Sequence, residues 1–65
     1  MTNLINIELI RDYIAKNNLS KTKFCRLCKI NISTLNRIFS GGNFNLIAIF
    51  KIARVLKVEV YRMFN

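Results

Sequence analysis

The side chains best suited to chemistry in this 65-residue chain lie between Ser20 and Gly41. This stretch carries no acidic residue and five basic ones: Lys21, Lys23, Arg26, Lys29 and Arg37. Lysine and arginine donate hydrogen bonds to anions, and arginine can bond a guanine edge through two parallel hydrogen bonds. The apolar spacing predicts two short amphipathic helices here, and a short helix pair with a positive face fits a DNA groove. The indicated chemistry is binding of phosphates and base edges.

The second of these helices carries the side chains that could contact bases. Its outer face offers side chains able to bond base edges or phosphates: Ser33, Thr34, Asn36 and Arg37. Arg37 is the leading candidate for reading a base, and its alternatives are a phosphate contact or a solvated charge. Ile32 could contact a thymine methyl group or pack against the preceding helix. Thr34 could contact DNA or lie half-buried between the two helices.

Cys25 and Cys28 form a Cys-x-x-Cys pair, a spacing found in metal and redox sites. A zinc site would need two further ligands, and the chain has no histidine and no other cysteine. A thioredoxin-like pair would follow a strand at the start of a helix, whereas this pair lies in the middle of a predicted helix. Both cysteines fall on its apolar side. We interpret them as packing residues and predict neither a metal nor a cofactor.

Enzymatic chemistry is not indicated by the remaining side chains. General acid–base catalysis needs histidine or positioned carboxylates, and the acidic residues, scattered along the chain, are Glu8, Asp12 and Glu59. The glycine pair at 41–42 follows a helix and is not followed by the Lys-Ser/Thr of a phosphate-binding loop. We therefore expect a protein that is not an enzyme and infer no small-molecule ligand.

Length and composition favour one small globular domain with an anionic partner. Half of the residues are hydrophobic (52%), and eleven lysines and arginines against three acids give a net charge of +8. This content predicts a single folded domain over residues 1–65, with no room for an effector domain, rather than a disordered tail. The charge favours nucleic acid or a membrane surface as partner, although it could confer solubility alone.

The chain shows no sign of membrane insertion or export. No apolar run reaches the roughly 18 residues that span a bilayer. The first ten residues lack a basic segment ahead of their apolar residues, and no cleavage-site pattern follows. We expect a cytoplasmic protein without a membrane partner.

Apolar periodicity predicts five helices that position these residues. The first runs from about residue 5 or 7 to Lys16. The second begins at the cap Ser20 and ends near Lys29, and the third begins at the cap Asn31 and leads to a loop at 40–43. The fourth is capped at residue 43 or 45 and continues through Leu56, and a short fifth helix spans 59–64. Asparagines 17 and 18 are the expected stop of the first helix, because asparagine tolerates the left-handed conformation.

These elements resemble the Cro/phage-repressor (XRE-like) type of helix-turn-helix, a large group of small bacterial and phage regulators. The matching positions in the helix pair are Leu19-Ser20, Phe24-Cys25, Cys28, Ile30, Thr34-Leu35, Arg37-Ile38 and Gly41. A second block matches the family's fourth helix at Leu46, Ile49, Ile52-Ala53, Leu56 and Val58. The resemblance covers about residues 7–64. It implies an all-α, compact five-helix lambda-repressor-like domain with the helix-turn-helix at helices 2 and 3.

The resemblance also implies a function and positions for the DNA contacts. It implies a sequence-specific double-stranded DNA-binding transcription regulator, and we expect a small bacterial or phage-encoded repressor associated with the nucleoid. Family members read bases with the residues that stand here at Ile32, Ser33, Asn36 and Arg37. The position of Lys21 touches the phosphate backbone. The loop after the third helix offers backbone N–H groups to the opposite strand, here from Ser40, Gly41 and Asn43.

The C-terminal residues are the predicted self-association surface of a homodimer bound to a double-stranded operator. They are Val60, Tyr61, Met63 and Phe64. A dimer of this kind would contact two half-sites about 34 Å apart. The sequence does not by itself separate a monomer from a dimer.

Four positions depart from the family pattern. Lys29 and Lys57 stand where glycine is usual, and a left-handed residue other than glycine costs about 1 kcal/mol. Either the turns differ here or that cost is tolerated. Cys25 replaces the usual small alanine, and Phe39 replaces an acidic residue, which predicts a more buried position.

Two other classes of function fit parts of the sequence. Some helix-turn-helix look-alikes bind proteins, in antitoxin or anti-repressor roles, but an acidic face on the third helix would favour that reading and this face is basic. A cationic membrane-active peptide would also combine a charge of +8 with amphipathic helices. The capped helices and short turns favour a preformed globule over such a peptide.

Overall fold

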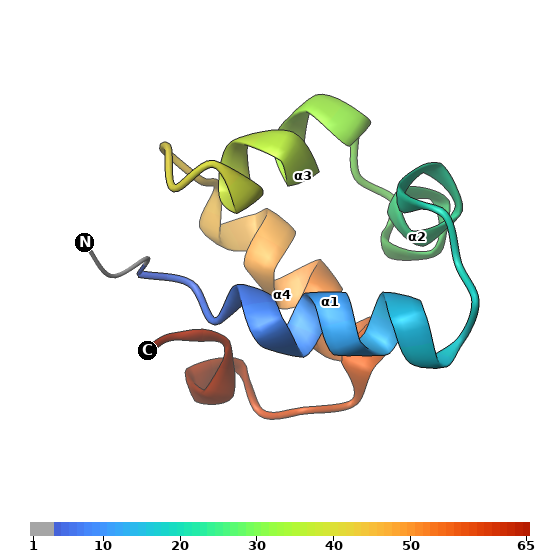
Figure 1. Cartoon of the computed structure of the whole chain (residues 1–65). Coiled ribbons are helices and arrows are strands. Elements are labelled where there is room, and N and C mark those ends of the chain that lie inside the picture. Colours follow the sequence, from blue (N-terminus) through green and yellow to red (C-terminus); the bar gives the residue numbers. More distant parts are fainter. Residues whose placement is uncertain (1–3) are drawn as a thin grey trace.

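Four α-helices and one short 3-10 helix make up the computed structural model, which describes residues 4–65 (Figure 1). Their bounds are α1 Ile7–Lys16, α2 Lys21–Cys28, α3 Ile32–Phe39, α4 Leu46–Leu56 and η1 Val60–Met63. The four α-helices lie where the apolar periodicity predicts them. The expected fifth helix is instead one 3-10 turn, in which the N–H of Arg62 donates to the carbonyl of Glu59 at 3.0 Å. Four residues are too few to form an α-helix of useful length.

Side-chain caps start two of the helices. The hydroxyl of Ser20 accepts a hydrogen bond from the backbone N–H of Lys23 at 3.1 Å, and the Asn45 side chain accepts one from the N–H of Ile47 at 2.8 Å. The expected cap at Ser20 is therefore present, and Asn45 rather than Asn43 caps α4. Asn31 stands at the predicted start of α3, but its side chain makes no capping bond.

Each of the four α-helices is followed, within two residues of its end, by a residue of left-handed conformation. The φ angles are 53° at Asn18, 59° at Lys29, 81° at Gly41 and 59° at Lys57. After α2, the N–H of Lys29 donates to the carbonyl of Arg26 and that of Ile30 to the carbonyl of Cys25 at 3.0 Å, so the last carbonyls are satisfied. Lys29 and Lys57 thus form the turns that glycine forms in the family pattern, and the steric cost is tolerated.

Glycine at either lysine turn is expected to stabilise the fold. Lys29→Gly and Lys57→Gly relieve the left-handed strain, and the greater freedom of glycine in the unfolded chain offsets part of this gain. We expect the free energy of unfolding in urea to rise by about 0.5–1 kcal/mol for each. The matched control Lys23→Gly removes the same charge from inside α2 and should lower it by about 1 kcal/mol. A lower free energy of unfolding in both Lys29→Gly and Lys57→Gly would contradict the presence of strain at these turns.

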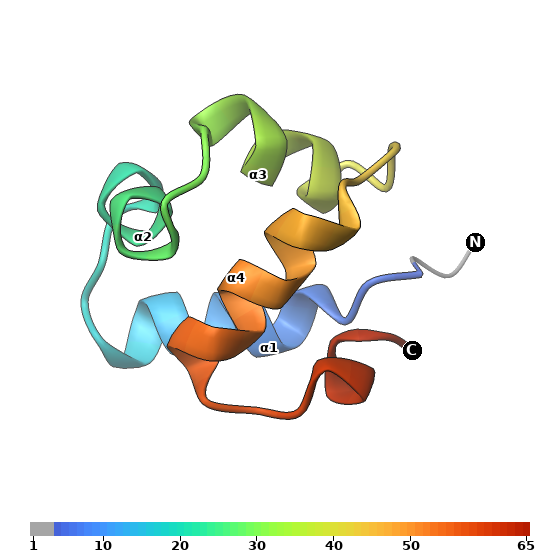
Figure 2. The same ribbon diagram turned by 180° about the vertical axis from the view of Figure 1, so that it is seen from behind.

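The helices enclose one apolar core. Its buried members are Ile5, Ile10, Phe24, Cys25, Cys28, Leu35, Ile38, Ile49, Ile52, Ala53 and Met63. Helix α4 passes between α3 and the C-terminal segment, as the view from behind shows (Figure 2). Its buried residues, Ala48, Ile49, Ile52 and Ala53, lie in the middle of the helix, and it contacts α2 and η1. Because α3 packs on this core by Leu35 and Ile38, its opposite face is left to solvent.

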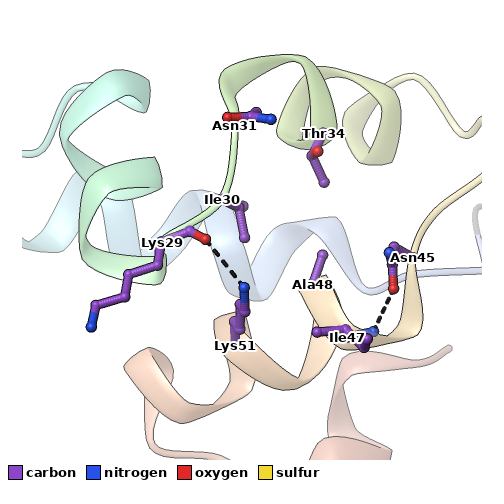
Figure 3. A pocket seen from close by; sticks show the side chains of 8 residues that line it. All are labelled: Lys29, Ile30, Asn31, Thr34, Asn45, Ile47, Ala48 and Lys51. Atoms are coloured by element: carbon purple, nitrogen blue, oxygen red, sulfur yellow. Dashed lines mark hydrogen bonds between the residues drawn. The ribbon is translucent and has the colours of Figure 1, made fainter.

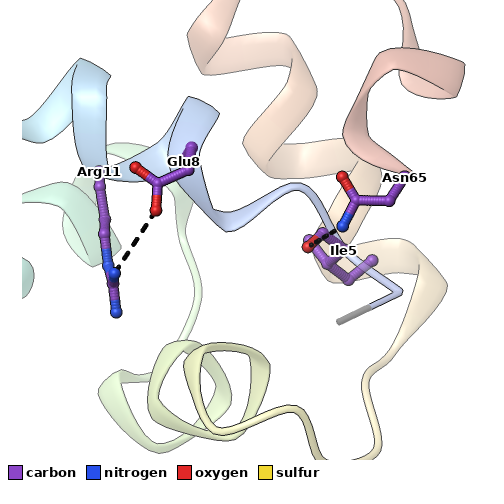
Figure 4. Close-up of polar contacts among 4 residues, drawn as sticks. All are labelled: Ile5, Glu8, Arg11 and Asn65. Atoms are coloured by element: carbon purple, nitrogen blue, oxygen red, sulfur yellow. Dashed lines mark hydrogen bonds and ion pairs between the residues drawn. The ribbon is translucent and has the colours of Figure 1, made fainter. Parts of the chain in front are cut away.

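The two ends of the described chain are joined by hydrogen bonds. The N–H of Asn6 donates to the carbonyl of Met63 at 2.7 Å, and the N–H of Asn65 donates to that of Leu4 at 2.9 Å. The side-chain amide of Asn65 also donates to the carbonyl of Ile5 at 3.2 Å (Figure 4). These contacts hold the C-terminal segment against residues 4–6, and Met63 of this segment lies in the core.

Both cysteines are core residues of α2. Each thiol is free, and each residue is 3% exposed. Burial raises the pKa of Cys25, and burial together with the neighbouring Cys25 raises the pKa of Cys28 to about 12. A thiol that stays protonated is a poor nucleophile and a poor metal ligand. The interpretation of these residues as packing residues agrees with this environment.

Ionisation of Cys28 should make stability depend on pH in the alkaline range. The unfolded thiol has its ordinary pKa of 9.0, whereas the folded one has a pKa of about 12, so the unfolded chain loses its proton first. The contribution is therefore fully present below pH 9 and is lost as the pH rises toward 12. Between pH 9 and 10 it should fall by about 1 kcal/mol. Urea unfolding of the wild type and Cys28→Ala at both pH values measures this, and equal losses in the two proteins would contradict it.

Candidate nucleic-acid interface

Helices α2 and α3 form a pair joined by only three residues, 29–31 (Figure 1). The left-handed Lys29 turns the chain at the end of α2, and Asn31 is extended before α3 begins. The two helices contact one another, and Phe24 of α2 and Leu35 of α3 are both fully buried in the shared core. Because the apolar side of each helix faces the core, the basic and polar sides of both helices face outward.

The outer face of α3 carries most of the predicted base-reading residues. Ser33, Asn36 and Arg37 are exposed, as expected for residues opposite the core. Ile32 is 41% exposed and belongs to this face, so packing against α2 is not its main environment. Arg37 provides a fork of hydrogen-bond donors, Ser33 and Asn36 provide small polar groups, and Ile32 provides an apolar side chain.

Thr34 faces a different direction, toward a cleft between α3 and α4 (Figure 3). The cleft has a volume of about 270 Å³ and is lined by Lys29, Ile30, Asn31, Thr34, Asn45, Ile47, Ala48 and Lys51. Within it the ammonium group of Lys51 donates to the carbonyl of Lys29 at 3.4 Å. The half-buried position of Thr34 agrees with its structural alternative, and the sequence carried no signal for the cleft.

The loop after α3 uses its backbone groups to end the helix. The N–H groups of Ser40 and Gly41 donate to the carbonyls of Asn36 and Ile38, at 3.0 and 3.2 Å. The hydroxyl of Ser40 donates to the carbonyl of Arg37 at 3.0 Å. In this structure helix termination occupies both N–H groups, and a role of Ser40 and Gly41 in DNA binding stays a prediction. Asn43 is exposed in this loop.

A basic cluster with an aromatic centre lies where α1, α2 and α3 meet. The ammonium group of Lys21 is 5.1 Å from the centre of the Phe39 ring, and the guanidinium carbon of Arg11 is 5.5 Å from it. Phe39 is half-buried, as its replacement of an acidic residue predicts. Arg11 also pairs with Glu8 at 3.6 Å on an exposed stretch of α1 (Figure 4). The sequence did not predict Arg11 as a member of this cluster. The signal available in the sequence was the aromatic residue at position 39, whose ring can attract cations.

Acidic residues are absent from the helix pair and from α4. Between Tyr13 and Val58 the sequence contains no aspartate or glutamate. The basic residues of this segment therefore have no acidic residue near them in the sequence. A surface of this kind has a positive potential that attracts polyanions.

The predicted self-association residues are divided between the core and the surface. Met63 is fully buried, so it packs within one chain and does not face a second copy. Val60 and Phe64 are half-buried, and the Phe64 ring lies 6.2 Å from that of Phe44. Tyr61 alone among the four is well exposed, at 74%. Met63 is thus a core residue of one chain, and self-association through the other three residues stays a prediction.

The helix pair, its polar outer face and its positive surroundings fit the helix-turn-helix class of DNA-binding domain. A helix-turn-helix family model matches residues 10–62. The chain belongs to this family, the Cro/phage-repressor type, whose members are DNA-binding regulators rather than enzymes. No match was found among curated proteins or among solved structures. Within residues 4–65, no helix is long and apolar enough to cross a membrane.

Proposed function

We propose that this protein is a sequence-specific transcriptional repressor that binds double-stranded DNA, with α2 and α3 as its helix-turn-helix and α3 in the major groove. The observation that carries this proposal is the exposed polar face of α3, with Arg37 upon it, in a segment that has no acidic residue. A helix in the major groove reads bases with such a face. We propose that the protein acts on DNA in the bacterial cytoplasm and that its gene belongs to the bacterium or to a phage.

Each residue of that face has a proposed role. Arg37 bonds a guanine edge through two hydrogen bonds, Ser33 and Asn36 bond neighbouring base edges or phosphates, and Ile32 contacts a thymine methyl group. Lys21, exposed at the first position of α2, contacts the phosphate backbone.

The flanking residues have lesser proposed roles. Thr34 supports the angle between α3 and α4 from within the cleft. In the loop after α3, Asn43 is the remaining candidate for a contact to the opposite strand, and Ser40 and Gly41 shape that loop.

We propose further that the repressor binds as a homodimer to two half-sites about 34 Å apart. The exposed Tyr61, with the half-buried Val60 and Phe64 beside it, is the proposed contact between the two copies. Sedimentation of the protein alone and with a duplex carrying two half-sites tests this point.

Selection of binding sites from random duplex DNA tests the main proposal. A repressor should enrich one motif, and titration of that motif and of a scrambled duplex at about 0.05 and 0.15 M salt should show a preference that persists at the higher salt. Equal affinity for both duplexes at about 0.15 M salt would reject sequence-specific regulation, because only electrostatic attraction would remain.

A protein-interaction module of the same fold is the second candidate. It is supported by exposed apolar side chains at the start of α4, where Leu46, Ile47 and Phe50 are 50%, 60% and 48% exposed. Exposed apolar groups that gather on one helix often mark contacts with proteins. Recovery of one stoichiometric protein partner, without any enriched DNA motif, would favour this candidate over the repressor.

A further inference from the structure

Phe39 brings together two cations that are far apart in the sequence. Its ring centre lies 5.5 Å from the guanidinium of Arg11 in α1 and 5.1 Å from the ammonium of Lys21 in α2. The face of an aromatic ring is negative and attracts cations, by roughly 0.5–1 kcal/mol at an exposed site. The ring thus offsets part of the repulsion between the two like charges, of which Arg11 is also paired with Glu8 of α1.

This cluster borders the proposed reading face of α3. Ile32 and Asn36 precede Phe39 by seven and three residues, so the three side chains follow one side of the helix. Arg11 and Lys21 therefore lie along the edge of that side. A helix seated in the major groove has a phosphate backbone along each edge.

We propose that Phe39 positions Arg11 and Lys21 together against one DNA strand, and that Arg11 is a phosphate-contacting residue of this protein. The inference rests on the proposed DNA-binding function and extends it to α1. Phe39 acts as a positioning residue: it touches the two cations and holds them before DNA arrives. Binding then requires less ordering of two long side chains, each of which is otherwise free to rotate.

Glu8 competes with DNA for Arg11 in this arrangement. Its carboxylate lies 3.6 Å from the guanidinium, and both side chains are mostly exposed, at 74% and 58%. An exposed ion pair of this kind is weak and is screened by salt. A phosphate can therefore replace Glu8 at small expense, and Glu8→Gln should strengthen binding to every duplex.

Salt dependence of binding to the selected motif and to a scrambled duplex tests the role of Arg11. Arg11→Ala should lower the slope of log affinity against log salt by about 0.9, and should weaken both duplexes alike, roughly eightfold at 0.1 M salt. The matched control is Arg62→Ala, which removes the same charge from η1 at an exposed site away from α3. It should leave the slope nearly unchanged.

Two substitutions at position 39 test the positioning role. Phe39→Leu keeps an apolar side chain but removes the ring, and should weaken both duplexes roughly two- to fivefold. Phe39→Tyr keeps the ring and should restore wild-type affinity. In the free protein, proton spectra should show upfield ring-current shifts for the Arg11 Hδ and Lys21 Hε protons, which Phe39→Leu abolishes and Phe39→Tyr preserves.

The outcomes separate this inference from the proposed function. If the wild type binds its motif but Arg11→Ala and Arg62→Ala have equal slopes, Arg11 is not a phosphate contact and the inference is overturned. Absence of the ring-current shifts in the wild type would overturn the positioning role, whatever the stability of Phe39→Leu. Failure of the wild type to bind any duplex at 0.05 M salt would overturn the proposed function itself, and this inference with it.

Discussion

Replacing Phe24 with alanine is expected to remove most of the stability of this domain. The side chain is fully buried, and its ring lies 5.9 Å from that of Tyr13 in a tilted arrangement. Truncation of a buried phenylalanine costs about 3–5 kcal/mol, through lost burial and the cavity left behind. A chain of this length has a total free energy of unfolding of only about 3–10 kcal/mol. Urea denaturation followed by circular dichroism should show most of that stability lost.

Leu27 is the matched control for this prediction. It lies in the same helix, three residues further along the chain, but its side chain is 52% exposed. Leu27→Ala should change the free energy of unfolding by less than about 1 kcal/mol, because little apolar area returns to water. Similar losses for the two variants would show that the core is not arranged as described. DNA binding should fail in Phe24→Ala and persist in Leu27→Ala.

Arg37→Ala is expected to relax base preference at one position of the operator. The arginine is exposed on the outer face of α3 and is the only residue of that face with a bidentate donor fork. Its loss should weaken binding to the preferred site by about 1–3 kcal/mol. Affinity for a site already altered at that base pair should change far less. Titration of the wild type and the variant against all four bases at each position measures this.

Lys21→Ala provides the contrasting result. A phosphate contact carries no sequence information, so this variant should weaken all duplexes evenly and lower the salt slope by about 1. If Arg37→Ala also weakened binding to all duplexes equally, Arg37 would contact the DNA phosphate backbone rather than a base. The proposed orientation of α3 would then need revision, because its central basic side chain would lie over phosphates.

The helices were predictable because their signals are local. Ser20 caps α2 through its own hydroxyl, and apolar residues recur at helical spacing along α1 and α4. The turns at Lys29 and Lys57 were located by the family pattern, although lysine does not favour them. Their conformation depends on hydrogen bonds from the next residues, Ile30 and Val58, back to the preceding helix. Each glycine-like turn is thus closed by a local hydrogen bond to the helix that it follows.

The C-terminal segment and the loop after α3 were less predictable. An apolar tail can be read as a contact surface or as a core segment, and only the pairing of the two chain ends turns Met63 inward. Likewise, the loop glycine at 41 indicated a turn, but its N–H proved to be committed to Ile38. Hydrogen-bond satisfaction at a helix end is a property of geometry, which residue type alone does not specify.

The sequence by itself determined the family, the four α-helices and the basic, acid-free segment that carries Arg37 and Lys21. These follow from residue order, since capping, periodicity and charge act over a few positions. Only the tertiary structure placed Arg11 beside Lys21 on Phe39, and Thr34 in the cleft rather than on the outer face. Such contacts join separate helices, and their partners depend on the angles at which α1, α2, α3 and α4 pack around the core.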